Sequence, residues 1–114
     1  CGSRGWTDMA TIAKRIGELS DDAIIIHGGA EGADQIAGRA CELRGLHTAV
    51  VYPRWKFYGR SAGHKRNAAM LDLEPDLVIA FSLGTNGTQG TIDGARSRGI
   101  PVEVIGIESK ELVA

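Results

Sequence analysis

The sequence predicts a single α/β domain, a Rossmann-like three-layer arrangement in which helices cover both faces of a parallel sheet of about five strands. Two observations support this prediction. Short apolar, β-branched runs alternate with amphipathic stretches along residues 1–114, which is typical of repeated strand–helix units and of parallel strands. The chain has 114 residues, of which 43% are hydrophobic, enough for one domain with its own core.

The first half of the chain alternates helix, strand, helix and strand. Residues 9–19 carry large apolar side chains every three to four positions, the spacing of a helix with one buried stripe. Residues 23–28 are apolar and β-branched, as in a strand that is covered on both faces. Residues 33–45 repeat the helical spacing and end at a glycine, a common helix stop. A second strand over 48–53 ends at a proline.

The second half repeats the alternation after an irregular stretch. We expect a loop of aromatic and cationic residues over 54–63, followed by a helix over 64–73 and a strand over 76–81. A glycine- and threonine-rich turn over 82–90 then leads to a helix over 91–99 and a last strand over 100–107. At the start of the chain, "CGSRGW" has the composition of a turn that follows a strand. We therefore interpret Cys1 as the last residue of a first strand that is mostly missing from the sequence.

Small-residue turns follow three of the expected strands: "CGSRGW", "HGGAEGAD" and "LGTNGTQGT". Glycines let backbone amides approach a ligand closely, and the amides at a helix N-terminus attract anions such as phosphate. Ligands of parallel sheets bind beyond the carboxyl ends of the strands. A single turn of this kind is explained equally well as a tight turn with nothing bound. Three at one edge predict an anion-binding site, in which Asp34 caps a helix or holds a ribose hydroxyl.

Polar side chains around these turns are candidate ligand contacts. Arg4 offers a guanidinium to a phosphate or carboxylate, although a solvated loop arginine has the same appearance in a sequence. Thr85 and Thr88 add hydroxyl donors. Arg66 and Asn67 open an expected helix and either face the same edge or form a surface pair.

Three aromatic residues, Trp55, Phe57 and Tyr58, share one expected loop in a chain that is only 5% aromatic. They could stack on a base, and we include Trp55 among the candidate contacts on this ground. Packing against a second copy of the chain explains them as well, so we expect a homodimer or a higher homo-oligomer. His27 closes an apolar strand, where a histidine is more often structural than catalytic.

Composition and motifs exclude several classes of protein. A net charge of −1 gives no bulk attraction to nucleic acid, and the chain shows no apolar run long enough for a membrane helix. Cys1 and Cys41 have no metal-binding spacing, and neither a P-loop nor a GxGxxG motif occurs. We therefore expect a cytoplasmic protein with no metal and no cofactor, and neither a membrane nor a nucleic acid as its partner.

Four stretches in this order, "GSRGWTD", "HGGAEGAD", "YPRWKFYGRSAGHKRNAAML" and "GTNGT…GIPV", resemble the YspA/cpYpsA-related branch of the SLOG superfamily over nearly the whole chain. Distant relatives include the LOG phosphoribohydrolases and the Smf/DprA DNA-processing proteins. The resemblance implies a Rossmann-like fold and a pocket for a nucleotide or nucleotide-derived ligand. The ligand-contacting residues that it implies are Gly2, Ser3, Arg4, Gly28, Gly29, Ala30, Asp34, Arg66, Asn67, Gly84, Thr85, Gly87 and Thr88.

One departure from the LOG enzymes bears on catalysis. These enzymes use a glutamate one turn into the helix that follows their GGxGT motif, and the corresponding positions here are Gly90 and Thr91. Asp93 is the nearest carboxylate, but two further residues turn it about 200° around the helix. Without a carboxylate there is no obvious stabiliser of an oxocarbenium ion and no base for water, so we expect no catalytic residue.

Three functions follow, in order of preference. The first is binding of a nucleotide-derived small molecule, as a sensor or as a phage sponge that sequesters a host signalling nucleotide. The second is a LOG-like enzyme that hydrolyses a nucleoside monophosphate, in which replacement of Asp34 or Asp93 abolishes turnover. The third is a DNA-binding module like the Smf/DprA proteins, against which the near-neutral charge argues.

Overall fold

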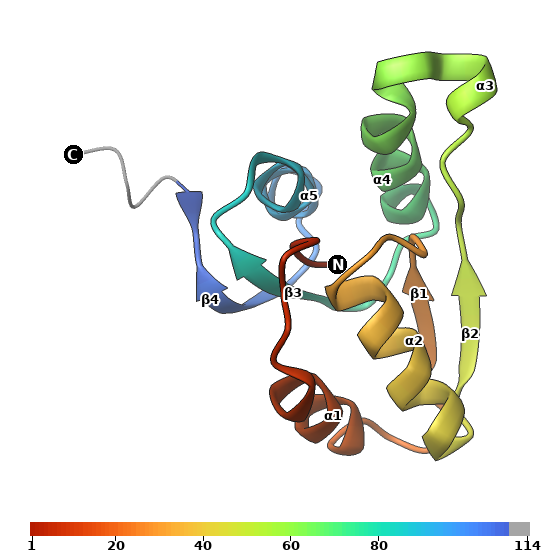
Figure 1. Cartoon of the computed structure of the whole chain (residues 1–114), viewed down its shortest axis with the longest axis vertical. Coiled ribbons are helices and arrows are strands. Elements are labelled where there is room, and N and C mark those ends of the chain that lie inside the picture. The colour runs from red at the N-terminus through yellow and green to blue at the C-terminus, as the bar shows by residue number, and fades with distance from the viewer. Residues whose placement is uncertain (110–114) are drawn as a thin grey trace.

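The computed structural model describes residues 1–109, which fold into alternating helices and parallel strands (Figure 1). The prediction of an α/β domain with a Rossmann-like arrangement is confirmed. The elements in chain order are α1 (Met9–Gly17), β1 (Ile24–His27), α2 (Ala33–Arg44), β2 (His47–Val50), α3 (Trp55–Tyr58), the 3₁₀ helix η1 (Gly59–Ser61), α4 (Ala62–Asp72), β3 (Val78–Leu83), α5 (Asn86–Ser97) and β4 (Val102–Ile107).

The strands form two parallel pairs rather than the single sheet of about five strands that we expected. Strand β1 pairs with β2, and β3 pairs with β4. The first residues of the chain lie along β3, where Gly2 forms an isolated parallel bridge with Phe81. The amide of Ser3 donates to the carbonyl oxygen of Phe81 at 2.9 Å, and the amide of Phe81 donates to that of Cys1 at 3.0 Å. Residues 1–3 therefore lie as a short extended segment along β3, parallel to it.

The two pairs are separated by a groove of about 630 Å³, which both β1 and β3 line. Ile25 and Ile26 contribute from β1, and Val78 and Ile79 contribute from β3. Strands β1 and β3 do not pair with each other. The expectation that the first strand is covered on both faces is wrong for Ile24, whose exposed fraction is 67%.

Strand β3 lies between two helical layers. Its successive side chains point to opposite faces, and the two faces contact two different clusters. Phe81 packs with Ile12 of α1 and Cys41 of α2, whereas Val78 packs with Leu71 of α4 and Ala95 of α5. Helices therefore cover both faces of this strand, in the three-layer order that the alternation of elements predicts.

Two expected boundaries are wrong in the same direction, because helix extends into stretches that we read as loop. The aromatic stretch expected as a loop over 54–63 contains α3, η1 and the first residues of α4. Gly59, at φ +56°, interrupts the α-helical backbone there. The turn expected over 82–90 ends earlier, because α5 begins at Asn86 with the extended residue Thr85 as its N-cap. Gly87 and Thr88 consequently belong to the first turn of a helix.

No helix among residues 1–109 is long and apolar enough to cross a membrane. Within the same range, no group of three or more histidine, cysteine, aspartate or glutamate side chains is arranged to hold a metal ion. Cys1 and Cys41 are free thiols, and burial raises the pKa of Cys41.

Candidate functional site

A pocket of about 310 Å³ opens where the start of the chain, the start of α2, one face of α4 and the start of α5 meet. The three small-residue turns lead into three of these walls, as expected for the carboxyl edge of parallel strands. Most of the residues proposed from the sequence line this pocket. They are Gly2, Ser3, Arg4, Ala30, Asp34, Arg66, Asn67, Thr85, Gly87 and Thr88.

Three hydroxyl groups form one wall of the pocket. Ser3 Oγ lies 2.8 Å from Thr85 Oγ1, and Thr85 Oγ1 donates to Thr88 Oγ1 at 3.1 Å. Ser3 is buried and its Oγ also accepts from the amide of Leu83 at 2.9 Å, which holds the hydroxyl in place. The wall stands at the N-terminus of α5, where no side chain caps the helix and the first backbone amides have no partner within it. Hydroxyls and amides together form a surface that suits an anion.

Asp34 holds the turn that follows β1. Its side chain is 5% exposed, and Oδ2 accepts from the amide of Gly28 at 3.0 Å and from that of Ala30 at 3.4 Å. A buried carboxylate is costly unless hydrogen bonds satisfy it, and these two amides supply them. Asp34 thus shapes the "HGGAEGAD" turn, while the pocket also touches it.

Arg66 joins α4 to the same turn. Its Nη1 donates to the carbonyl oxygen of Gly28 at 2.7 Å, and its Nε donates to Asn67 Oδ1 at 2.7 Å. Burial lowers the pKa of Arg66, the neighbouring Asp34 raises it, and the positive charge of Arg4 lowers it again. Because arginine keeps its proton in proteins, the outcome is a partly buried, oriented cation that faces a second cation across the pocket.

The ion pairs of the protein distinguish eight of its nine arginines by their position, and the ninth, Arg54, is neither paired within residues 1–109 nor part of the pocket. Five arginines away from the pocket form ion pairs with carboxylates: Arg15, Arg39, Arg44, Arg96 and Arg98. The three that line the pocket, Arg4, Arg60 and Arg66, form none with any residue in 1–109.

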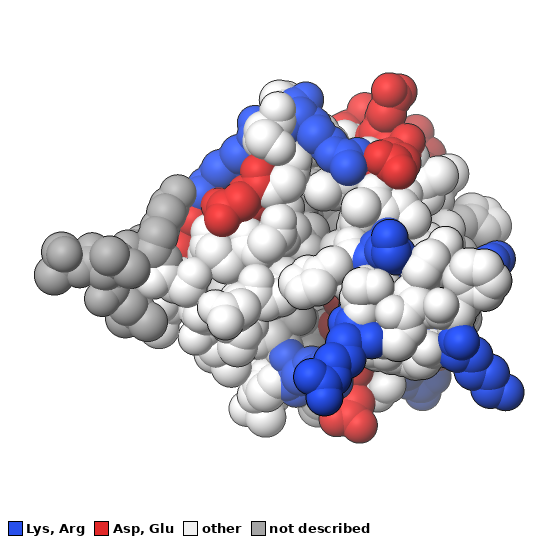
Figure 2. Space-filling model, turned by 90° about the horizontal axis from the view of Figure 1, so that it is seen from above, with Lys and Arg blue, Asp and Glu red and all other residues white. Residues whose placement is uncertain are grey.

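In Figure 2, which shows the molecule from above, some blue side chains on the right stand apart from one another, whereas blue and red side chains at the upper left lie against one another. The three pocket arginines differ from the five paired ones in having no carboxylate partner within residues 1–109.

Four of the proposed residues do not line the pocket. Gly28, Gly29 and Gly84 act on its shape: Gly29 and Gly84 have φ of +69° and +82°, a conformation that favours glycine. A Cβ on Gly28 would come within 2.2 Å of Arg66 Nη1. Trp55 lies at the edge, where its Cη2 would be 3.9 Å from a Cβ on the pocket residue Gly63.

Sequence reasoning missed most of the pocket wall that α4 and η1 form, although it named Arg66 and Asn67 there. Arg60, Gly63, His64 and Met70 line it beside Asn67. Their spacing of three to four residues is the signal of one helical face. That signal was hidden because residues 54–63 were read as a loop, which removed the first turn of the pattern.

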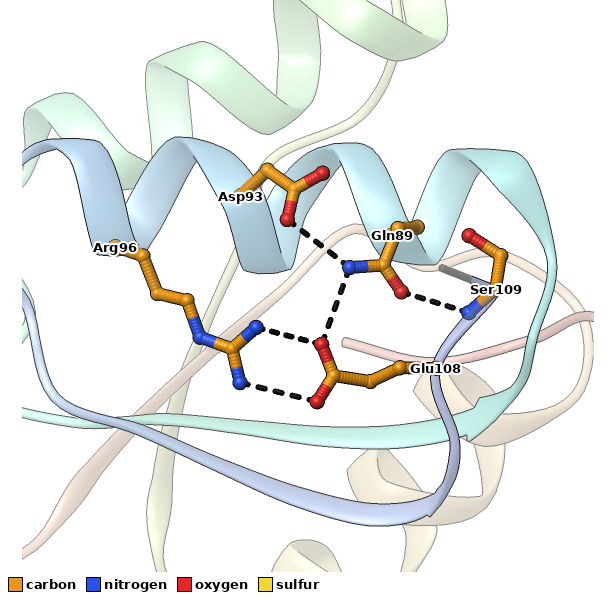
Figure 3. Close-up of polar contacts among 5 residues, drawn as sticks. All are labelled: Gln89, Asp93, Arg96, Glu108 and Ser109. Carbon is orange, nitrogen blue, oxygen red and sulfur yellow. Dashed lines mark hydrogen bonds and ion pairs between the residues drawn. The ribbon is translucent and has the colours of Figure 1, made fainter. Parts of the chain in front are cut away.

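Asp93, the carboxylate nearest to the positions of the LOG glutamate, lies outside the pocket lining. Figure 3 shows Asp93 on α5, where its Oδ1 accepts from Gln89 Nε2 at 3.0 Å. The same Gln89 nitrogen donates to Glu108 Oε1 at 3.2 Å, so this side of α5 is joined to the end of β4. Asp93 does not line the pocket, whereas Thr91 does. Asp34 is the one carboxylate among the pocket-lining residues within 1–109.

His27 has a structural environment. It is buried at the end of β1, its Nδ1 accepts from the amide of Gly29 at 3.0 Å, and its Nε2 would be 2.9 Å from a Cβ on Gly38. Burial lowers the pKa of His27. The imidazole lines the groove between the strand pairs and not the pocket, in agreement with a packing role.

The fold and the sequence of this chain are both similar to those of known proteins. DNA processing protein A (DprA) from Streptococcus pneumoniae has a similar fold, with a TM-score of 0.80 and 21% identity over 95% of this chain and 49% of that chain. This chain thus corresponds to about half of the DprA chain, and the likeness concerns the fold alone. The Gene 61 protein of Mycobacterium phage D29 is 34% identical over 111 residues, which cover 89% of each protein. The family model YAcAr, the YspA, cpYpsA-related SLOG family, matches residues 1–58, and the chain belongs to this family.

Proposed function

We propose that the protein binds a nucleotide or a nucleotide-derived small molecule in the pocket and holds it without turning it over. One observation carries the proposal: the three arginines that line the pocket lack a carboxylate partner within residues 1–109, while five of the six arginines away from it are ion-paired. Guanidinium groups held apart from carboxylates in a concave site favour a phosphate or carboxylate ligand.

The remaining walls favour a nucleotide over a simple anion. The hydroxyls of Ser3, Thr85 and Thr88, with the N-terminus of α5, suit a phosphate group. Asn67 keeps its amide nitrogen for a ribose hydroxyl or a base, because its oxygen accepts from Arg66. Trp55, half exposed at the pocket edge, offers a face on which a base can stack. The volume of about 310 Å³ lies at the lower end of the range for small-molecule sites.

Sequestration follows from the lack of a suitable catalytic group. A glycoside hydrolase uses carboxylates as acid, base or nucleophile. Among the described residues that line the pocket, Asp34 is the one carboxylate. That carboxylate is engaged by two backbone amides. A relative from a phage fits a role in which the protein removes a signalling nucleotide of the host. Hydrolysis by Asp34 is the second candidate, because the side chain does touch the pocket.

The proposal is tested by native mass spectrometry of the purified protein, followed by heat release and identification of any small molecule. A thermal-shift screen of nucleotides, NAD and cyclic nucleotides accompanies it, since a ligand at 100 times its Kd stabilises a protein by about 2.7 kcal/mol. We expect an intact nucleotide-derived ligand and a loss of binding in Arg66→Ala. Arg98→Ala is the matched control, because Arg98 pairs with Asp72 away from the pocket.

Two results decide against this proposal. Recovery of a free base with ribose phosphate, or its production from an added nucleotide, would establish hydrolysis and favour the second candidate. No stabilisation by any nucleotide, together with no bound molecule in the purified protein, would remove the nucleotide-binding function.

A further inference from the structure

Two groups of nitrogen-bearing side chains line the pocket at different levels along η1 and α4. Arg66 lies in the middle of α4, beside the turn that follows β1. Arg60 and His64 lie nearer the start of this helical segment, in η1 and in the first turn of α4. Arg60 and Arg66 are six residues apart, which corresponds to about 9–12 Å along the axis of a 3₁₀ and α-helical segment. One small anion cannot lie next to both ends of such a distance unless the side chains fold together.

The inner level already has what a single phosphate needs. The hydroxyls of Ser3, Thr85 and Thr88 lie at the N-terminus of α5, and Arg4 lies close enough to Arg66 to lower its pKa. The carboxylate of Asp34 favours the charged form of Arg66 from the other side. These contacts leave Arg60 and His64 without a role in holding the first anion.

The outer level, unlike the inner one, has no polar partners among residues 1–109. Arg60 and His64 are exposed and take part in no ion pair or side-chain hydrogen bond within residues 1–109. No aspartate or glutamate occurs between Tyr52 and Asn67, the segment that carries this wall, although charged residues make up 24% of the chain. Opposite charge at the pocket mouth therefore has to come from a bound molecule.

We propose that the ligand is a nucleotide with a second, separate phosphate group, which Arg60 and His64 bind at the mouth while the first phosphate lies against the hydroxyl wall. This inference rests on the proposed function, because it assigns each of the two phosphate groups of the proposed ligand to one part of the pocket. It distinguishes a nucleoside bisphosphate, whose phosphates lie on different ribose positions, from a monophosphate or a diphosphate, whose charge lies at one position.

Calorimetric titration with AMP, ADP and adenosine 3′,5′-bisphosphate, and with the corresponding guanosine series, tests the proposal on the wild-type chain. We expect the bisphosphate of at least one series to bind at least tenfold more tightly than the monophosphate, and more tightly than the diphosphate. In Arg60→Ala we expect this preference for the bisphosphate over the monophosphate to disappear, because the second phosphate loses its guanidinium partner.

Arg54→Ala is the matched control. Arg54 is also exposed and in no ion pair within residues 1–109, but it does not line the pocket, so this variant should keep the preference for the bisphosphate. Equal binding of monophosphate and bisphosphate by the wild-type chain, or an unchanged preference for the bisphosphate in Arg60→Ala, would overturn the two-phosphate assignment and leave nucleotide binding intact. Failure of every nucleotide to bind would instead overturn the proposed function itself.

Discussion

The guanidinium group of Arg66 donates a hydrogen bond of 2.7 Å to the carbonyl oxygen of Gly28, across 38 residues of sequence. The bond joins α4 to the turn after β1, and Asp34 fixes the other side of that turn through the amide of Gly28. A glycine is needed at this position because the arginine side chain occupies the space where a Cβ would be. The orientation of the pocket's most buried cation thus depends on the absence of one methyl group.

We predict that Gly28→Ala weakens ligand binding about as much as Arg66→Ala, while the fold is largely kept. The added Cβ would lie 2.2 Å from Arg66 Nη1 and 2.6 Å from its Cζ, so the flexible guanidinium moves away. The lost hydrogen bond costs about 1 kcal/mol of stability, and the less flexible unfolded chain returns about 0.4–1 kcal/mol. Chemical denaturation should therefore show a change below about 1 kcal/mol, and calorimetry a loss of affinity.

Gly2→Ala provides the contrast to Gly28→Ala. Its Cβ would lie 2.3 Å from Ala33 Cβ and 2.6 Å from the carbonyl oxygen of Phe81, neither of which can rotate away. We expect a loss of about 1–3 kcal/mol, as for an overpacked core. Equal destabilisation by the two substitutions would contradict the role assigned to the Arg66 side chain.

We predict that Gly90→Ala stabilises the protein by about 0.5–1 kcal/mol, because glycine in the interior of a helix is unfavourable by this amount. Gly90 lies within α5 and a Cβ there would meet nothing within 4 Å. Gly45→Ala is the control, since its surroundings are equally open but φ is +80° at the C-cap of α2. It should destabilise by about 1–2 kcal/mol. Thermal unfolding of both variants measures the difference, and stabilisation by Gly45→Ala would refute the argument from φ.

The sequence was a sufficient guide to the elements whose signal is local. Uninterrupted β-branched runs located β1, and the stripe that includes Ile12 and Ile16 located α1. The three small-residue turns gave the edge at which the pocket lies, because parallel strands bring their carboxyl ends together. Asp34, Thr85 and Thr88 could be named in advance for this reason, whereas Ser3 was named from the family resemblance.

The rest depends on information that is not local. Aromatic and cationic residues after Pro53 suggested a loop, yet they form α3 and η1, and the helical face from Arg60 to Met70 was missed with them. The glycines of α5 hid a helix start that Thr85 caps by its extended backbone. The strand pairing was also not predicted, since β1 and β3 line a common groove and do not pair with each other.

We predict that the free energy of unfolding decreases as the pH falls below about 6.5, the ordinary pKa of histidine, and that His27 is a cause. Burial lowers the pKa of His27 in the folded protein, so the unfolded chain takes up a proton there first. When the unfolded state binds more protons, stability is lost as the pH falls from the unfolded pKa toward the lower folded pKa. Denaturation at a series of pH values between 5 and 8 measures this slope.

His27→Asn separates this contribution from those of other groups. The asparagine oxygen can still accept from the amide of Gly29, as His27 Nδ1 does at 3.0 Å, but it does not titrate. The variant should therefore be less dependent on pH in this range, while His47 and His64 are unchanged in both proteins. A slope that is the same in the variant and the wild type would show that His27 does not contribute.

We predict that the protein forms a homodimer through the aromatic side chains of α3. Phe57 is 77% exposed and contacts Tyr58 edge to face, with Trp55 half exposed on the same helix. Clustered exposed apolar groups of this kind often mark an interface. Sedimentation velocity over a range of concentrations should show a dimer that Phe57→Ser weakens. Leu43→Ser is the control, because Leu43 is 73% exposed on α2, and an equal effect of both variants would argue against α3 as the interface.

We predict that Asp34→Asn keeps both the fold and ligand binding, whereas Asp34→Ala loses about 1–3 kcal/mol of stability, the cost of leaving a buried donor without a partner. In the structure Asp34 Oδ2 accepts from the amides of Gly28 and Ala30, and an asparagine can present its single oxygen to the same two amides. If Asp34 instead acted as a catalytic carboxylate, the asparagine variant would lose its reaction while keeping its stability, because an amide can neither accept a proton from water nor stabilise a positive charge. Calorimetry, denaturation and a hydrolysis assay on the two variants therefore separate a residue that shapes the turn from one that performs chemistry. Measurable hydrolysis by the wild-type chain that Asp34→Asn abolishes would contradict the binding function, and stable, ligand-binding Asp34→Asn protein with no hydrolysis in either form would support it.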